Sequence, residues 1–243
     1  MRATYIVFGC LLCAVSLSGC CGSLLPSRII GSGTVVTQDY DLDGFDQVEV
    51  QDGFQAEISA GDTFAVRLEV DQNLVDHVDV LKVGSTLTIR LKPLSSYSLV
   101  NVTRRAKVSM PRLLGIESSG GSQVEIHGFR SNEDLSTEVS GGGRLSGDIE
   151  AGELEFVCSG GSDLTLDGAG DGLGLEASGG SEVDLADFEV ADASIAASGG
   201  SRVTVNVSGR LDVQASGGSK VYYLGSPILG EIDSSGGSSV QPK

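Results

Sequence analysis

Seven short serine-glycine motifs carry the residues of this 243-residue chain that first suggest chemistry. Each reads Ser-Gly-Gly-Ser or a close variant, and the copies begin at Ser119, Ser140, Ser159, Ser178, Ser198, Ser216 and Ser235. A nucleophilic serine needs a general base beside it. The chain has two histidines, His77 and His127, which cannot serve seven equivalent serines. The sequence therefore favours a structural role for the motif, and it predicts no catalytic residue.

A second pattern, Gly172-x-Gly174-x-x-Ala177, matches a dinucleotide-binding fingerprint. That fingerprint requires a helix directly after it, because the helix N-terminus holds the pyrophosphate. Here the surrounding apolar residues alternate with a period of two, which is typical of a strand. The match is therefore interpreted as chance, and no cofactor-binding residue is predicted.

A calcium site is the most serious alternative, since the formal net charge is −17. A calcium-binding β-roll needs an acidic ligand at the same place in every repeat. The residue after each motif changes sign instead: Gln123, Arg144, Asp163, Glu182, Arg202, Lys220 and Ser239. This column predicts ion pairs between stacked strands, Arg144 with Asp163 and Glu182 with Arg202. No metal ligand set is predicted, although a single calcium ion among Asp163, Asp167, Glu182 and Asp184 stays open.

The acidic balance also argues against nucleic acid as a partner, because phosphate groups would be repelled. The cysteines, like the histidines, are too few to form a repeated site. Beyond the first nineteen residues only Cys20, Cys21 and Cys158 occur, which is no disulfide framework and no zinc site. Cys158 falls in a column of small residues and is expected to be buried in the core.

The N-terminus has the features of a targeting segment. Arg2 precedes an apolar run from Ile6 to Leu17 that is too short to span a bilayer. The following Leu17-Ser18-Gly19-Cys20 resembles a bacterial lipobox, which predicts a signal peptide over residues 1–19 and lipidation of Cys20 by diacylglycerol and palmitate. Such acyl chains anchor a protein to a membrane without a transmembrane helix. The alternative is a plain secretory signal with an incidental cysteine.

The rest of the chain divides into three parts by composition. Residues 20–28 are expected to form a lipidated tether. Residues 29–114 alternate apolar and polar residues between turns such as Asp52-Gly53 and Gly84-Ser85, which predicts an N-terminal β region. One helical turn is expected within residues 71–77.

Residues 115–243 contain the repeat, whose copies start 18 to 21 residues apart. A step of this size is typical of a solenoid, in which each coil must stack on the next to bury its apolar face. Before each motif lies a strand with three inward positions. The outermost is Leu114, Leu135, Leu154, Leu173, Ala193, Leu211 and Gly230; the middle is Ile116, Thr137, Phe156, Leu175, Ile195, Val213 and Ile232; the last is Ser118, Val139, Cys158, Ala177, Ala197, Ala215 and Ser234. The sequence therefore predicts an all-β, β-helix-like solenoid of about seven short coils, on which the N-terminal β region stacks as an extension or cap. The glycines form sharp corners, where serines could hydrogen-bond along the solenoid axis.

With this pattern in place, the chain resembles the auto-transporter adhesin head domain family, also called the GIN domain. The motifs that carry the resemblance are Gly31-Ser32-Gly33, Phe45-Asp46-Gln47-Val48-Glu49-Val50, Phe54, Ile58, Gly61, Asn73-Leu74, Leu87-Thr88-Ile89, Pro111-Arg112-Leu113 and the serine-glycine repeats. The resemblance implies one continuous domain over residues 29–243 with a right-handed β-helix-like fold. It also implies an exported protein or lipoprotein, and it supplies no catalytic or binding residues.

The functional expectation is a non-enzymatic binding or adhesion module that is exported and lipid-anchored to the cell envelope. The residue after Cys20 is not Asp, which favours the outer membrane as its location. Its expected partners are the membrane, through the lipid, and a glycan or envelope protein. Two alternatives stay open. One is a carbohydrate-active β-helix enzyme, although the short coils leave little room for the long loops that wall a catalytic cleft. The other is a homo-oligomeric envelope scaffold that associates through the end of the stack near Val240.

Overall fold

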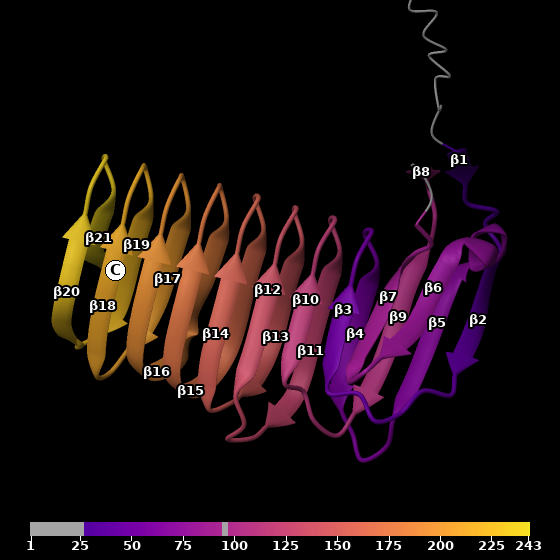
Figure 1. Cartoon of the computed structure of the whole chain (residues 1–243), viewed down its shortest axis with the longest axis horizontal. Helices are drawn as coiled ribbons and strands as arrows, with labels where there is room; N and C mark the ends of the chain where they lie inside the picture. The colour runs from indigo at the N-terminus through magenta and orange to yellow at the C-terminus, as the bar shows by residue number, and fades with distance from the viewer. Residues whose placement is uncertain (1–26, 94–96) are drawn as a thin grey trace, which may run out of the picture.

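The computed structural model describes residues 27–93 and 97–243. It is an all-β structure, with 65% of residues in strands and 3% in helix, and its stacked parallel coils form a β-solenoid of about six turns. The serine-glycine motifs form a line of corners along one edge of the solenoid (Figure 1). The predicted fold class is therefore confirmed. The signal peptide, Cys20, Cys21 and most of the tether lie outside the described residues.

Each coil contributes one strand before its corner and one strand after it. We call the sheet of preceding strands the upstream sheet and the sheet of following strands the downstream sheet. The upstream sheet runs in the order β6 (Val78–Val83), β7 (Thr86–Leu91), β3 (Gln47–Val50), β10 (Gly115–Ser118), β12 (Leu135–Val139), β14 (Glu153–Cys158), the second part of β15 (Asp163–Ala177), the second part of β16 (Glu182–Ala197), β18 (Arg210–Ala215) and β20 (Ile228–Ser234). The downstream sheet runs in the order β2 (Val35–Tyr40), β5 (Ala65–Asp71), β9 (Arg104–Met110), β4 (Gln55–Ala60), β11 (Gln123–Arg130), β13 (Arg144–Glu150), the first parts of β15 and β16, β17 (Arg202–Val207), β19 (Lys220–Gly225) and β21 (Ser239–Pro242).

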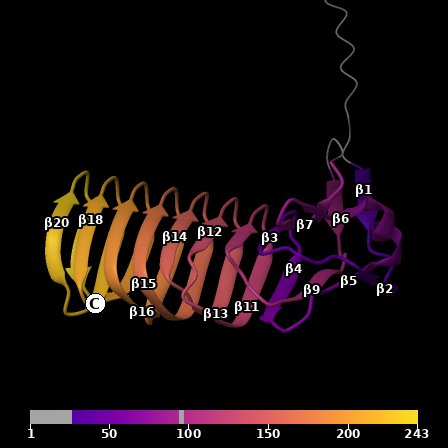
Figure 2. The ribbon, with the colours of Figure 1, turned by 60° about the horizontal axis from the view of Figure 1, so that its bottom comes forward.

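The two sheets are joined at both edges. β15 and β16 continue from the downstream into the upstream sheet round the edge opposite the corners (Figure 2). At the N-terminal end the pairing becomes antiparallel. The antiparallel pairs are β6 with β7, β5 with β9, and β2 with β5. A short parallel pair, β1 (Ser27–Ile30) with β8 (Tyr97–Val100), lies at the same end. The expected helical turn is present as a 3-10 helix over Gln72–His77. Among the described residues, no helix has the length and apolar character needed to cross a membrane.

The inward columns form the core as predicted, because period-two strands place alternate residues inside. The middle column is in register from Ile116 through Phe156 to Ile232. Three predicted inward positions were wrong. Leu113, rather than Leu114, is part of the buried core, and Ser234 is exposed. Leu229, rather than Gly230, pairs with Leu211, because the register shifts between Leu211 and Val213. Cys158 is fully buried, as expected, and burial raises the pKa of its thiol to about 12.

The corners explain the repeated motif. The first glycine of every motif has a positive φ, between 56° at Gly141 and 72° at Gly179, which L side chains rarely adopt. At the last four corners the final serine hydroxyl donates to a backbone carbonyl of the preceding coil. These bonds are Ser181 to Cys158 (3.3 Å), Ser201 to Ala177 (3.4 Å), Ser219 to Ala197 (3.2 Å) and Ser238 to Ala215 (3.0 Å). The serines therefore do link coils along the axis, through backbone carbonyl groups.

The solenoid also extends into the N-terminal region. β3 and β4 lie in parallel register with β10 and β11, so residues 47–60 form a further coil whose corner is Gln51-Asp52-Gly53-Phe54. Asp52 (φ 57°) and Gly53 (φ 71°) take the same conformation as Gly120 (60°) and Gly121 (76°) of the first motif. The Asp52 carboxylate accepts a hydrogen bond from the backbone of Leu91 at 2.9 Å. This coil connects the antiparallel end to the repeats.

Candidate functional site

The outward face of the upstream sheet presents one continuous row of side chains beside the corners, which we call the upstream row. Its members lie in register on adjacent strands and alternate with buried residues. From the N-terminal end they are Glu49, Glu117, Glu138, Val157, Glu176, Ala196, Gln214 and Asp233. Neighbouring strands lie about 4.8 Å apart, so the row forms a straight, rigid array along the solenoid axis.

The upstream row carries negative charge that forms no ion pair with any of the described residues. Within the described part of the chain, Glu117, Glu138 and Glu176 form no ion pair. Glu49 accepts a hydrogen bond from Thr88 Oγ1 at 2.7 Å. Burial, together with the neighbouring charges of Glu49 and Glu138, raises the pKa of Glu117 above the usual glutamate value. Like charges directly opposite one another destabilise a sheet, so this row costs folding energy.

An open groove of about 530 Å³ runs along the C-terminal half of the same row. Its wall on the corner side is made by the first serines of four motifs: Ser178, Ser198, Ser216 and Ser235. Val157, which is 39% exposed, and Ala196 line this groove on either side of Glu176, and Gln214 and Asp233 follow along the row. The groove offers hydroxyls, carboxylates and a small apolar surface at repeated spacing, which suits an extended polar partner.

The downstream face is different, because several of its charges are paired. Salt bridges on this face join Arg67 to Asp39 (2.7 Å), Lys107 to Glu57 (3.2 Å), Arg144 to Asp163 (3.0 Å) and Arg202 to Glu182 (3.6 Å). The last two are the pairs that the sequence predicted, and both are confirmed. They occupy Asp163 and Glu182, two members of the suggested calcium set. Across residues 27–93 and 97–243, no three His, Cys, Asp or Glu side chains are grouped to hold a metal ion.

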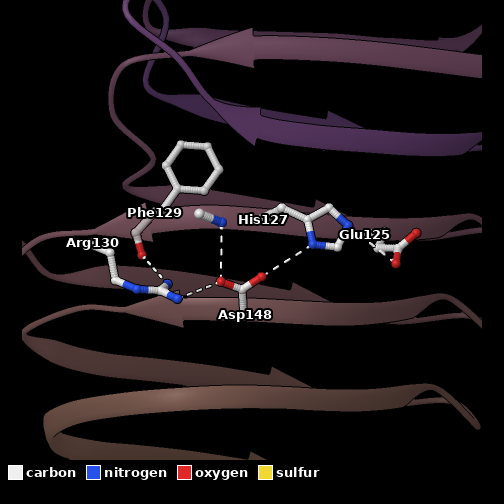
Figure 3. Close-up of polar contacts among 6 residues, drawn as sticks. Glu125, His127, Phe129, Arg130 and Asp148 are labelled. Atoms are coloured by element: carbon white, nitrogen blue, oxygen red, sulfur yellow. Dashed lines mark hydrogen bonds and ion pairs between the residues drawn. The ribbon is translucent and has the colours of Figure 1, made fainter.

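A histidine cluster crosses the downstream face at a β-bulge between β11 and β13 (Figure 3). His127 Nδ1 lies 3.3 Å from Asp148 Oδ1, and its Nε2 lies 3.3 Å from Glu125 Oε1. Arg130 donates to Asp148 at 2.7 Å and also pairs with Glu150 at 2.9 Å. The Arg130 guanidinium holds the pKa of Asp148 below its usual range, with further help from His127 and the Gly128 N–H and against the effect of burial.

This cluster contains acid–base groups but lacks the rest of a catalytic site. In the part of the chain that the structure describes, no serine, threonine or cysteine side chain hydrogen-bonds to His127. A nucleophile needs that contact, so the geometry indicates an electrostatic link between two coils. Sequence reasoning missed the cluster, although a signal existed. Glu125 and His127 share a face by the period of two, and Asp148 follows His127 by 21 residues, the step between the first two motifs.

Two further sequence candidates are now placed. The fingerprint-like run from Gly172 to Ala177 lies inside strand β15, and no helix follows it, which agrees with its interpretation as chance. Cys20, the predicted lipidation site, lies outside the described residues and stays a prediction.

Comparison with known proteins agrees with this geometry. Residues 44–227 match the family model described as "Putative auto-transporter adhesin, head GIN domain". No curated protein matches the chain. A "putative adhesin" from Bacteroides fragilis has a similar structure, with a TM-score of 0.81 and 18% identity over 88% of this chain and 100% of that one. Two further structures share the fold. A "putative lipid binding protein" from Parabacteroides distasonis has a TM-score of 0.72 and 20% identity over 89% of this chain and 100% of that one. A "putative adhesin" from Parabacteroides merdae has a TM-score of 0.66 and 14% identity over 89% of this chain and 99% of that one.

Proposed function

The chain belongs to the auto-transporter adhesin head GIN domain family, and from this premise we propose that it is an exported, non-enzymatic binding module of the bacterial cell envelope. Its partner is a glycan or an envelope protein that lies along the upstream face. The observation that carries the proposal is the uncompensated upstream row together with the groove beside it.

The contrast between the two faces supports this choice of surface. On the downstream face, ion pairs such as Arg144 with Asp163 offset several of the charges. The upstream row instead keeps carboxylates adjacent to one another at a cost to folding, which a bound partner would relieve through hydrogen bonds or positive charge. Serine hydroxyls at the groove wall add donors and acceptors. The rigid sheet also holds all these groups in place before binding, which lowers the entropic cost of association.

We propose further that Cys20 is lipidated and holds the protein at the outer membrane. Ser27, where β1 begins, follows Cys20 by seven residues. A chain of seven residues spans at most about 25 Å. The antiparallel end of the fold would therefore sit close to the bilayer, and the coils around Val240 would sit farthest from it. This placement would leave the upstream groove accessible to partners away from the membrane.

The anchor is tested by Cys20→Ala. The expected result is transfer of the protein from the membrane pellet to the soluble fraction, because the acyl chains supply the membrane affinity. Cys21→Ala is the matched control and should leave the protein in the pellet. Persistence of the Cys20→Ala variant in the pellet would show that another feature anchors the chain.

The binding role is tested by a screen of immobilised glycans and envelope proteins with the mature chain carrying Cys20→Ala. Saturable binding without turnover is expected, and the triple change of Glu117, Glu138 and Glu176 to Gln should weaken it. The control carries Asp167→Asn, Glu182→Gln and Glu189→Gln on the downstream face. Release of shortened glycans would indicate an enzyme, and a multimeric mass in solution without ligand binding would indicate a scaffold.

A further inference from the structure

We propose a second binding site, on the downstream face, for an acidic saccharide, meaning a sugar that carries a carboxylate beside free hydroxyl groups. The site lies where the antiparallel end meets the first coils, on strands β9, β4, β11 and β13. It rests on the proposed role as a binding module but uses none of the upstream residues.

A row of hydrogen-bond donors forms the first half of this site. Arg105, Gln55, Gln123 and Arg144 lie in register on four adjacent strands, and all four are exposed. Two arginines thus flank two amides over about 14 Å, the width of three strand spacings. Arg105 forms no ion pair within the described residues. Arg144 pairs with Asp163, but the Arg144 side chain is 65% exposed, and such surface pairs are weak and exchange readily. Guanidinium groups bind carboxylates through two parallel hydrogen bonds.

A row of acceptors forms the second half, two residues further along the same strands. It contains Glu57 and Glu125, with Lys107 on one side and Ser146 on the other. Lys107 lies 3.2 Å from Glu57, and His127 lies 3.3 Å from Glu125, so both carboxylates have a partner on one side. Ionised carboxylates accept several hydrogen bonds each. They are therefore free to accept from sugar hydroxyls about 7 Å from the donor row.

The two rows line one open groove of about 470 Å³, whose lining includes Arg105, Lys107, Glu57, Gln123 and Arg144. This size fits one or two sugar rings, since small-molecule sites commonly measure a few hundred cubic ångströms. A ligand with a carboxylate alone would make no use of Glu57 and Glu125 as acceptors, and a neutral sugar would leave Arg105 without an ion pair. Only a ligand with both groups satisfies both rows.

A smaller hollow at the neighbouring corner adds positive charge. It is lined by Gly53, Thr103, Arg104 and Arg105 and adjoins the groove through Gln55. The half-buried Arg104 donates through Nη1 to the carbonyl of Asp52, while its Nε is buried without a hydrogen-bond partner. This second guanidinium, one residue from Arg105, strengthens the local attraction for an anion.

The charge distribution limits the ligand to a short or terminal acidic sugar. Residues 27–114 carry twelve acidic and nine basic side chains, whereas residues 115–243 carry twenty-one and six. The positive groups of the site therefore lie at the less acidic end of the fold. A long polyanion extending over the later coils would meet strong repulsion.

The test is a titration of the mature chain carrying Cys20→Ala with glucuronate, glucose and inorganic phosphate, followed by calorimetry or NMR chemical shifts. We expect glucuronate to bind at least tenfold more tightly than either of the other two, because only glucuronate engages both rows. Arg105→Gln should weaken glucuronate binding about tenfold, the effect of losing one charge-assisted contact. The matched control is Arg202→Gln, which removes an arginine from the same row on β17, outside the groove, and should leave binding unchanged.

Equal glucuronate affinity for Arg105→Gln and Arg202→Gln would overturn the proposal, as would phosphate binding as tightly as glucuronate. Thermal unfolding of both variants should match the parent, since both arginines are exposed. Binding of the upstream partner serves as the separate readout. If Arg105→Gln leaves both that binding and glucuronate binding intact, this second site fails while the proposed function stands.

Discussion

The upstream and downstream faces of the solenoid differ in how they treat charge, although they share one core and one set of corners. On the downstream face, several carboxylates pair with arginine or lysine on a neighbouring strand, as in Arg144 with Asp163, although Glu57 lies beside Glu125 and Asp163 beside Glu182. On the upstream face, Glu49, Glu117 and Glu138 meet one another. Since both faces are built from the same repeat, the fold itself does not require this difference.

The comparison teaches that outward positions of this solenoid are chosen independently of its stability. The inward columns are mostly apolar, because a stacked repeat must bury them. Ion pairs on the downstream face contribute a little to folding, since surface pairs are worth between 0 and about 1 kcal/mol. The upstream row does the opposite. A surface that lowers stability slightly and is rigidly presented supports the binding role proposed above.

Disrupting a corner should destabilise the solenoid and with it both faces. Gly199→Val is the substitution expected to have the largest effect. Gly199 has φ +69°, and a Cβ there would lie 2.8 Å from the Gly179 carbonyl oxygen of the adjacent corner. Strained φ and a backbone clash together should cost about 3 kcal/mol or more. The measurement is the free energy of unfolding in urea.

The matched control is Gly180→Ala, in the same kind of motif. Gly180 has no positive φ, and a Cβ there would meet nothing within 4 Å. Its free energy of unfolding should stay within about 0.5 kcal/mol of the parent. A Gly199→Val protein as stable as this control would contradict the role assigned to the corners.

The repeat made most of the fold predictable, and the corners show why. Seven copies of one motif fix the period, the strand positions and the inward columns, so the pairs Arg144–Asp163 and Glu182–Arg202 follow from register alone. The N-terminal β region was expected to extend or cap the solenoid, but the individual coil over residues 47–60 was not identified within it. Its corner, Asp52-Gly53, keeps the required positive φ but not the serines. This corner therefore has the same backbone conformation as the others but not the serine-glycine motif by which they were found.

The candidate site was less predictable than the fold, for a related reason. The upstream row consists of the residues that the repeat leaves unconstrained, so no periodic pattern marks it. The row can be recognised only once strands far apart in sequence, such as β3 and β10, are known to be neighbours. The groove beside the row depends on the exposed serines and on the small Ala196, which the sequence assigns to corners and strands without indicating a hollow.

A change in the core beneath the upstream row should separate stability from binding. Thr137 lies inward between Ile116 and Phe156, and its hydroxyl is buried without a hydrogen-bond partner. Thr137→Val keeps the side-chain shape and removes the unpaired group, so the free energy of unfolding should rise by about 1 kcal/mol. Binding at the upstream face should not change. A loss of stability would mean that the Thr137 hydroxyl is in fact satisfied in solution.

Neutralising a single carboxylate should change the free energy of unfolding in opposite directions on the two faces. Glu117→Gln removes a negative charge between Glu49 and Glu138, so it should stabilise the fold by about 0.5 kcal/mol at neutral pH. Asp148→Asn removes the partner of Arg130 and should destabilise it by a similar amount. Urea unfolding of the two variants across pH measures both effects.

The pH dependence follows from the direction of each pKa shift. The pKa of Glu117 is raised in the fold, so the parent gains stability as pH falls through that folded value, and the advantage of Glu117→Gln disappears below the ordinary glutamate pKa. The pKa of Asp148 is lowered, so its contribution is present above the ordinary aspartate pKa and is lost as pH falls through the folded value. Shifts of the same sign for both groups, measured by NMR titration, would remove the contrast between the faces.

The smallest effect concerns a single ion pair on the downstream face. In a double-mutant cycle of Arg144→Ala and Asp163→Ala, the coupling energy should be between about 0.2 and 1 kcal/mol, because both side chains are largely exposed. The same cycle applied to Glu117 and Glu138 should give a coupling of the opposite sign, since removing either glutamate relieves the other. Added salt should shrink both couplings toward zero, because it screens attraction and repulsion alike. Couplings of equal sign on the two faces would mean that solvent neutralises the upstream row, and the case for binding there would then rest on the groove alone.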